Sequence, residues 1–188
     1  MSLVNDALQA ALKEYDRPDL ETDVTRRIRR ALFELHGVAL FPQDLTVSSL
    51  VATTTSPQTL SVPADMRFFN RIIAWDGTEE MAAEFQESSV INPVDYFNFS
   101  IPKYFLRRGS SIIVGYKDIA PSHLSIEYYK FPSFDAETLA TDSWIVATDY
   151  TILQNKLCAI VAKLAGKNDD IRGWEASVLS ALDAISGA

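Results

Sequence analysis

The chain has 188 residues, of which 47% are hydrophobic and 22% are charged. These proportions are typical of a globular protein and exclude a chain that is mostly disordered. A fold of this length buries about 70% of its unfolded surface, so neither a metal nor a disulfide is needed to hold it. The formal net charge of -8 argues against a site-specific DNA-binding protein, because an acidic surface repels phosphates.

Compartment signals are few. Cys158 is the single cysteine, so an intramolecular disulfide is excluded and no oxidising compartment is implied. The first 19 residues have neither a basic start nor a long apolar stretch, which argues against a secretory signal. The chain contains no run of about 18 apolar residues, so no membrane span is expected. We expect a protein that matures in a cytoplasm.

The first block, residues 2 to 37, has the pattern of two amphipathic helices. Apolar residues recur at four-residue spacing along two stretches. Pro18 separates them because proline lacks an amide donor, Asp19 is suited to cap the second helix, and Gly37 fits its C-terminal end. The two stripes consist of Leu3, Val4, Ala7, Leu8, Ala11 and Leu12, and of Leu20, Val24, Ile28, Ala31, Leu32 and Leu35.

The middle block, residues 45 to 131, predicts an antiparallel barrel or sandwich. It is rich in Val, Ile, Thr, Tyr and Phe, and glycines and prolines cut it into short segments. Asp76-Gly77 and Arg108-Gly109 are typical turn sites. The segment Thr78–Val90 is expected to include a short helix. The predicted strands are Leu45–Thr53, Thr59–Val62, Arg67–Trp75, Tyr104–Arg107, Ser111–Tyr116 and His123–Phe131.

The last block predicts two more helices, the first at Asp149–Ala165 and the second after the break at Gly166. Amphipathic helices at the two ends of a chain bury their stripes most readily against one another. We therefore predict an α+β protein. Residues 1–40 and 146–188 form a helical bundle, residues 45–131 form an inserted small antiparallel β barrel or sandwich, and residues 132–145 form a connector.

Signals for catalysis, cofactors and metals are absent or weak. The glycines have no phosphate-cradling spacing, and His36 and His123 do not form a zinc motif. His36 precedes Gly37, where a helix dipole favours a cation. A Ser-His-Asp site that uses His123 is a remote alternative, since sequence order does not define a triad. We predict no catalytic, cofactor or metal site. A run of four glutamates at positions 79, 80, 84 and 87 is interpreted as a solvated face.

Two helix faces are candidates for subunit interfaces. Arg26, Arg29, Arg30 and Phe33 share the face opposite the apolar stripe of their helix, where Phe33 is suited to anchor a contact. A neighbouring subunit or DNA is a possible partner of the arginines, and plain surface is the alternative. The back of the helix Asp149–Ala165 is small or apolar, with Cys158 and Ala162 among its residues. That helix is either central in the bundle or in contact with a neighbouring subunit.

The order of several motifs resembles the head-to-tail adaptor (tail tubular) proteins of tailed bacteriophages. The likeness covers nearly the whole chain, and the order and spacing of the motifs carry it. These motifs are "FPQDL" at Phe41–Leu45, "SVPADMRFFNRI" at Ser61–Ile72, "YFLRRGSSIIV" at Tyr104–Val114, "LSIEYYKFPSF" at Leu124–Phe134, and the C-terminal segment that begins "TDYTILQNKLCAIV". The family has no catalytic motif to carry over.

The resemblance implies a structural protein of the virion neck, assembled in the host cytoplasm. It implies a homo-oligomeric ring, twelvefold to match the portal, that docks on the portal protein and on the tail nozzle or next connector. Genomic DNA would pass through its lumen without sequence-specific binding, which suits an acidic chain. Two alternatives stay open. One is a carbohydrate-binding or cell-wall-hydrolysing tail component that uses Trp75 and clustered aromatics, and the other is a different neck protein, a stopper or tail terminator.

Overall fold

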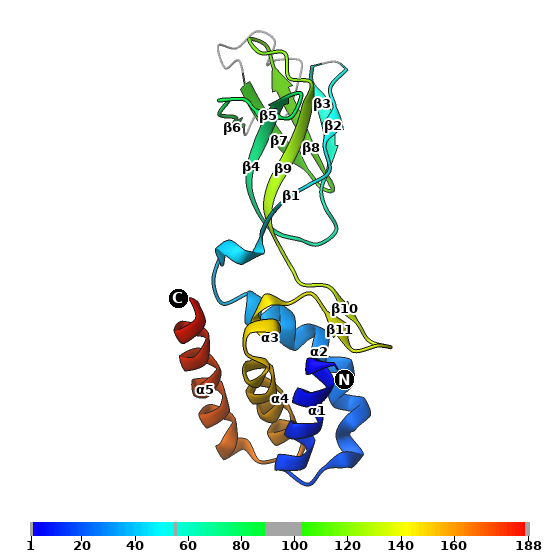
Figure 1. Ribbon diagram of the computed structural model, residues 1–188, viewed down its shortest axis with the longest axis vertical. Coiled ribbons are helices and arrows are strands. Elements are labelled where there is room, and N and C mark those ends of the chain that lie inside the picture. Colours follow the sequence, from blue (N-terminus) through cyan, green and yellow to red (C-terminus); the bar gives the residue numbers. More distant parts are fainter. Residues whose placement is uncertain (1, 55, 89–102, 187–188) are drawn as a thin grey trace. The chain divides into compact units, whose positions relative to one another are not determined.

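The protein is of mixed α and β structure. The computed structural model describes residues 2–54, 56–88 and 103–186, and Figure 1 shows them as a ribbon. The chain divides into two compact units, Met1–Asp44 with Phe131–Ala188, and Leu45–Lys130. The first unit is mainly helical and the second consists of strands. None of the helices in the described ranges has both the length and the apolarity that a membrane crossing requires.

The helical unit is built around one apolar core. Its central helix is α4, which lies between α1 and α5 (Figure 1) and also packs against α2. The predicted stripes of α1 and α2 are buried in this core, with the exception of Leu3, which is 43% exposed. The elements of the unit are α1 (Leu3–Glu14), η1 (Pro18–Leu20), α2 (Glu21–His36), η2 (Pro42–Asp44), β10 (Phe134–Asp135), β11 (Ala140–Thr141), α3 (Trp144–Thr148), α4 (Tyr150–Leu164) and α5 (Asn168–Ser186).

Local chemistry explains most helix boundaries. Pro18 opens the 3-10 turn that separates α1 from α2, as expected from its missing amide donor. The predicted capping role of Asp19 is wrong: its carboxylate pairs with Arg17 at 2.7 Å, and α2 begins without a side-chain cap. Asp149 caps α4 by accepting a hydrogen bond from the amide of Thr151 at 2.9 Å.

Residues 132–145, predicted as a connector, hold regular structure. They contain the β10–β11 hairpin and the first residues of α3. In the hairpin, Phe134 pairs with Thr141 and Asp135 pairs with Ala140. Each of these elements is too short to give a recognisable pattern in the sequence. The segment is acidic and contains Pro132, and it was therefore interpreted as a connector.

The described residues of the β unit form two sheets. One has the order β1-β9-β4-β5, with β2 also paired to β9, and the other has the order β3-β8-β7-β6. All these pairings are antiparallel except that of β6 with β7. The strands are β1 (Leu45–Val47), β2 (Val51–Ala52), β3 (Gln58–Ser61), β4 (Met66–Asp76), β5 (Glu79–Glu80), β6 (Gln86–Glu87), β7 (Lys103–Arg108), β8 (Ser111–Tyr116) and β9 (His123–Lys130).

Both sheets of the β unit bury apolar side chains in one shared core. The largest contributors come from β4 and β9 on one side and from β7 and β8 on the other. Gly77 and Gly109 adopt φ of 61° and 54° in the turns after β4 and β7, which confirms both predicted turn sites. The predicted strand Leu45–Thr53 is instead two short strands, β1 and β2, that pair with different parts of β9.

The short helix expected in Thr78–Val90 is absent from its described part. Residues 78–88 instead hold β5 and β6 with irregular chain between them, and positions 89 and 90 lie outside the described residues. The glutamates of this segment are exposed, as predicted. Two of them also form ion pairs, Glu80 with Arg71 at 2.6 Å and Glu87 with Arg107 at 3.1 Å. Cross-strand pairing therefore overrides the helical preference of this glutamate-rich segment.

Candidate functional site

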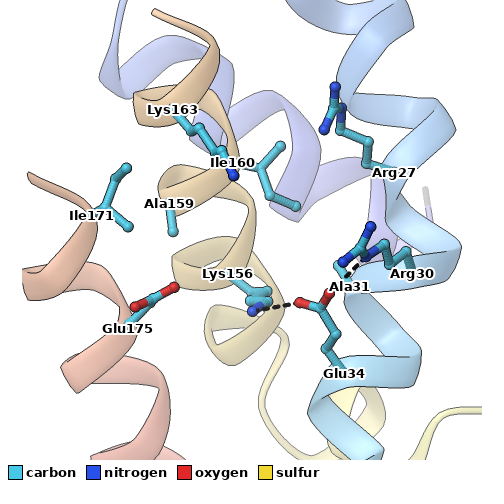
Figure 2. Close-up of a pocket in the computed structure, with 10 residues that line it drawn as sticks. All are labelled: Arg27, Arg30, Ala31, Glu34, Lys156, Ala159, Ile160, Lys163, Ile171 and Glu175. Carbon is cyan, nitrogen blue, oxygen red and sulfur yellow. Dashed lines mark hydrogen bonds and ion pairs between the residues drawn. The ribbon is translucent and has the colours of Figure 1, made fainter. Parts of the chain in front are cut away.

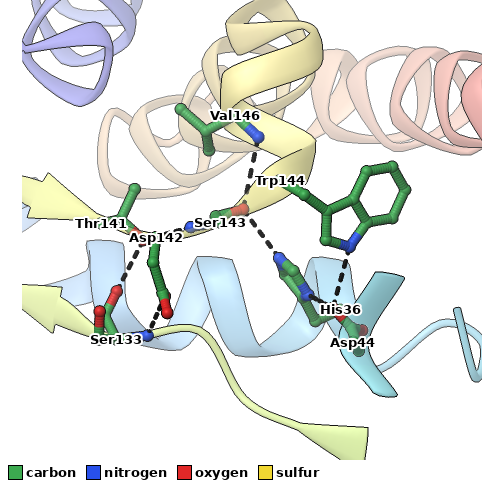
Figure 3. A network of polar contacts seen from close by, with 8 residues as sticks. All are labelled: His36, Asp44, Ser133, Thr141, Asp142, Ser143, Trp144 and Val146. Carbon is green, nitrogen blue, oxygen red and sulfur yellow. Dashed lines mark hydrogen bonds and ion pairs between the residues drawn. The ribbon is translucent and has the colours of Figure 1, made fainter. Parts of the chain in front are cut away.

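His36 is the centre of a buried polar network in the helical unit (Figure 3). Its Nδ1 lies 2.8 Å from Oδ1 of Asp44, and its Nε2 lies 2.8 Å from Oγ of Ser143. The indole N–H of Trp144 donates to the same Asp44 oxygen at 2.9 Å. The residues come from the end of α2, from η2 and from the start of α3, so the network ties three separate segments together.

One tautomer of His36 satisfies both of its ring contacts. Nδ1–H then donates to Asp44, and Nε2 accepts from the hydroxyl of Ser143. Ser143 Oγ in turn accepts from the amide of Val146 at 3.4 Å, which caps α3. This is the connectivity of a Ser-His-Asp triad, in which the serine oxygen attacks a substrate carbonyl.

Burial decides against catalysis by this network. His36 is 1% exposed, and Asp44 and Ser143 are each 2% exposed. A substrate therefore cannot reach Ser143 Oγ, and the role of the network is to stabilise the fold. The sequence interpretation placed His36 near the end of a helix. It lies in the last turn of α2, and its ring also contacts two buried side chains, Asp44 and Ser143.

His123, the residue considered in the sequence for a triad, stabilises a turn. Its Nδ1 lies 3.0 Å from Oγ of Ser122, and the Ser122 hydroxyl donates to the carbonyl of Trp75 at 3.0 Å. Ser122 Oγ also accepts from the amide of Gly77 at 2.8 Å. The hydroxyl is therefore already committed to the backbone, and this group has no carboxylate among those contacts to complete a triad.

The helical unit contains a basic groove between α2, α4 and α5 (Figure 2). It has a volume of about 240 Å³. Four cationic side chains and two carboxylates line it, so cations are in excess in a chain that is acidic overall. The lining residues are Arg27, Arg30, Ala31, Glu34, Lys156, Ala159, Ile160, Lys163, Ile171 and Glu175.

Glu34 neutralises only part of this positive charge. Its carboxylate accepts from Lys156 Nζ at 2.8 Å and from Arg30 Nε at 2.8 Å. Lys156 and then Arg30 lower the pKa of Glu34, so the carboxylate stays ionised. Arg27 and Lys163 have no ion-pair partner within the described residues, and they are exposed. They leave the groove with two cations that are open to an external anion.

The predicted arginine face divides in the structure. Arg30 lines the groove, whereas Arg26 faces Asp23 at 3.9 Å and Arg29 lies over the ring of Phe33 at 5.4 Å. Phe33 stacks on Phe131, with ring centroids 4.3 Å apart. Phe33 is therefore half-buried within its own chain, and the premise that it stands among the arginines without a partner is wrong.

Cys158 and Ala162 were candidates for a subunit interface, with α4 as the central helix of the bundle as the alternative, and their burial favours the alternative. Both are 0% exposed because α4 is covered by helices of its own chain. Burial raises the pKa of Cys158 to about 12, so the thiol is neutral and unreactive at physiological pH. The alternative interpretation of α4 as the central helix accounts for both residues.

Three cationic residues of the groove were not identified as site residues from the sequence. Arg27 lies next to the predicted face of α2, while Lys156 and Lys163 are seven residues apart on α4. That spacing places the two lysines on one side of a helix. The remaining element, α5, supplies Glu175 and Ile171, and only the packing of α5 against α4 brings them near.

The aromatic residues of the β unit that the structure describes differ in their exposure. Trp75 is half-buried, and its indole N–H donates to the buried Ser125 Oγ at 2.7 Å. Phe68, on the same strand, is 52% exposed and meets Tyr129 edge to face at 6.3 Å. Leu45 pairs with Tyr129 from β1, so one cross-strand row of this sheet presents apolar side chains to solvent.

Two comparisons with known proteins found no relative of the chain. A scan of protein-family models found no match to the chain, and a search of curated proteins also found none. Within residues 2–54, 56–88 and 103–186, no three His, Cys, Asp or Glu side chains gather in a group able to hold a metal ion. The basic groove is therefore the candidate site that the geometry itself brings forward, and its chemistry is that of binding an anion.

Proposed function

We propose that the protein is a virion structural protein, a head-to-tail adaptor that forms a ring between the portal and the tail of a tailed bacteriophage. In this proposal the two units are a helical bundle and an inserted antiparallel β barrel or sandwich. The ring retains packaged DNA and gives it a passage, with no sequence-specific contact. The partners are the portal protein, a tail nozzle or next connector, and further copies of the chain.

The observation that carries the proposal is where the adaptor-like motifs fall in the fold. The motif at Phe41–Leu45 contributes Phe41 to the helical core and Asp44 to the His36 network. The motif at Ser61–Ile72 supplies much of β4, and the motif at Tyr104–Val114 covers the β7–β8 hairpin. These motifs build two cores and contain no accessible catalytic group. They therefore favour a protein that acts by assembly.

The sealed triad-like network supports the same proposal over a hydrolytic one. A cell-wall hydrolase needs a nucleophile that its polymeric substrate can reach. Ser143 is 2% exposed, and its oxygen already caps α3. The buried network instead fixes segments that precede and follow the β unit along the chain. We propose that the helical unit docks on the portal and that the β unit binds on the tail side.

Assembly on portal tests the proposed function. Purified chain and purified portal rings are mixed and separated by sedimentation, and the complexes are imaged by electron microscopy. We expect the chain to be a monomer alone and to form a ring on the portal. A chain that stays monomeric beside intact portal would contradict the proposal. A tail-component pull-down and a glycan array with the free monomer distinguish it from a stopper, a tail terminator and a sugar-binding protein.

A further inference from the structure

Two charged surfaces of the helical unit are exposed in the single chain. One is the basic groove, where Arg27 and Lys163 have no counter-ion within the described residues. The other is the β10–β11 hairpin, where Asp135 at the end of β10 and Glu137 in the loop are exposed. The hairpin projects from the helices in Figure 1. No residue of the hairpin lines the groove of its own chain.

Hydrogen bonds order the loop of the hairpin. The Asp135 carboxylate accepts from the amide of Glu137 at 2.9 Å and from the hydroxyl of Thr138 at 2.6 Å. These bonds lower the pKa of Asp135, the hydroxyl of Thr138 contributing most, so the carboxylate stays charged. The hydroxyl of Ser2 donates to the carbonyl of Leu139 and ties the loop to the start of α1. A preorganised acidic loop binds with a smaller entropy cost than a flexible one.

We propose that the β10–β11 hairpin of one copy docks in the basic groove of the next copy, with Glu137 directed to Arg27 and Lys163. This contact rests on the proposed ring and deepens it by naming the two surfaces that meet. Groove and hairpin are different patches of one chain, so the contact is head-to-tail, and such contacts generate rings when the rotation closes. Each copy then gives one hairpin and receives one.

The lining of the groove favours a peptide over a nucleic acid. Glu34 and Glu175 add two carboxylates to the lining of the groove, and carboxylates repel phosphates. Ile160 and Ile171 form apolar wall that a phosphate cannot use but an incoming peptide chain can. Glu175 has no ion-pair partner within the described residues, so its oxygens are free to accept backbone N–H groups of the incoming loop.

Charge exchange tests the contact. Three variants are compared with the wild-type chain in the portal assembly: Arg27→Glu, Glu137→Lys, and the chain with both. Glu137 is chosen because the Asp135 carboxylate is needed for the loop itself. Each single reversal should weaken assembly about tenfold or more, and the double change should restore it to within a few-fold. Matched controls are Arg172→Glu and Asp183→Lys, exposed reversals on α5 outside the groove.

Disulfide trapping tests the same contact without portal. A chain with Arg27→Cys and Glu137→Cys, at high concentration and with a mild oxidant, should form a ladder of covalent oligomers. Each single-cysteine variant should form at most dimers, because the native Cys158 is buried and does not react. Circular dichroism of every monomer checks that folding is intact.

The outcomes separate this inference from the proposed function. If wild-type chain forms rings and the single reversals also form them normally, the hairpin contact is wrong and the adaptor proposal stands. If wild-type chain does not assemble on portal, the adaptor proposal fails. In that case the disulfide ladder alone decides the contact: a ladder retains it, and its absence overturns it.

Discussion

Phe33 on α2 stacks on Phe131, with ring centroids 4.3 Å apart and ring planes inclined by 15°. Phe131 is the first residue to return to the helical unit after the β unit. The pair therefore attaches the returning chain to α2 at the point where it re-enters the helices. Arg29 lies over the Phe33 ring, at 5.4 Å from its centroid.

This stacking predicts that Phe33→Ala destabilises the monomer. The loss should be about 1 to 2 kcal/mol, less than for a fully buried Phe because the ring is half-buried. A double-mutant cycle with Phe131→Ala should give a coupling energy of about 0.5 to 1.5 kcal/mol. Chemical denaturation of the four chains measures both quantities. Additive losses would show that the stacking contributes nothing of its own.

The sequence predicted the regular elements well where one physical pattern dominates. The apolar stripes of α1 and α2 have clean four-residue spacing, and both lie in the core. β8 was predicted with its observed bounds, because its flanking turns are marked on one side by Gly109 with φ of 54°. The short elements were missed. α3 has five residues and each strand of the β10–β11 hairpin has two, which is too short for any periodicity to show.

The candidate site was harder to predict because it depends on packing between distant segments. Arg30 was identified on its helix face, but the groove also needs Lys163 from α4 and Glu175 from α5. The contact of His36 with Ser143 joins residues 107 positions apart, and a sequence pattern carries no signal for that distance. Cys158 was a candidate for an interface because an apolar helix back has the same composition whether its own chain or another chain covers it.

The His36 network predicts a large loss of stability when its centre is removed. His36→Leu leaves Asp44 buried with one fewer donor, and we expect a loss of about 2 to 4 kcal/mol. Ser143→Ala removes the cap of α3 and one hydrogen bond, with a smaller loss of about 1 to 2 kcal/mol. Denaturant titration measures both. Equal stability of His36→Leu and wild type would show that the network does not stabilise the fold.

Glu34 predicts an acid-dependent contribution to stability. Its pKa is lowered in the folded state by Lys156 and Arg30, so its contribution is fully present above the unfolded pKa and is lost as the pH falls through the folded pKa. The difference in unfolding free energy between wild type and Glu34→Gln should therefore be constant at neutral pH and shrink below about pH 4.3. Its size should stay below about 1 kcal/mol because the side chain is 42% exposed.

Glu175→Gln is the matched control for this titration, since it removes a carboxylate from the same groove that has no ion pair within the described residues. We expect its unfolding free energy to stay close to that of wild type, because no ion pair is lost. A pH-dependent difference as large as that of Glu34→Gln would show that the ion pairs of Glu34 are not the cause.

Cys158 predicts a thiol that does not react while the protein is folded. Burial keeps reagents away from the thiol and raises its pKa to about 12. Very little of the reactive thiolate therefore forms, and a reagent cannot reach it. A colorimetric thiol reagent at pH 8 should detect almost no free thiol in native protein and one per chain in denaturant. Rapid reaction of the native chain would contradict the burial of α4 between its neighbours.

Imaging of the intact virion neck at subnanometre resolution tests the central claim most directly. The claim is that this chain is a head-to-tail adaptor, and it predicts a ring of identical copies between portal and tail, with the helical unit in contact with the portal. A particle in which the chain is present as a single copy, or is absent from the neck, would contradict it.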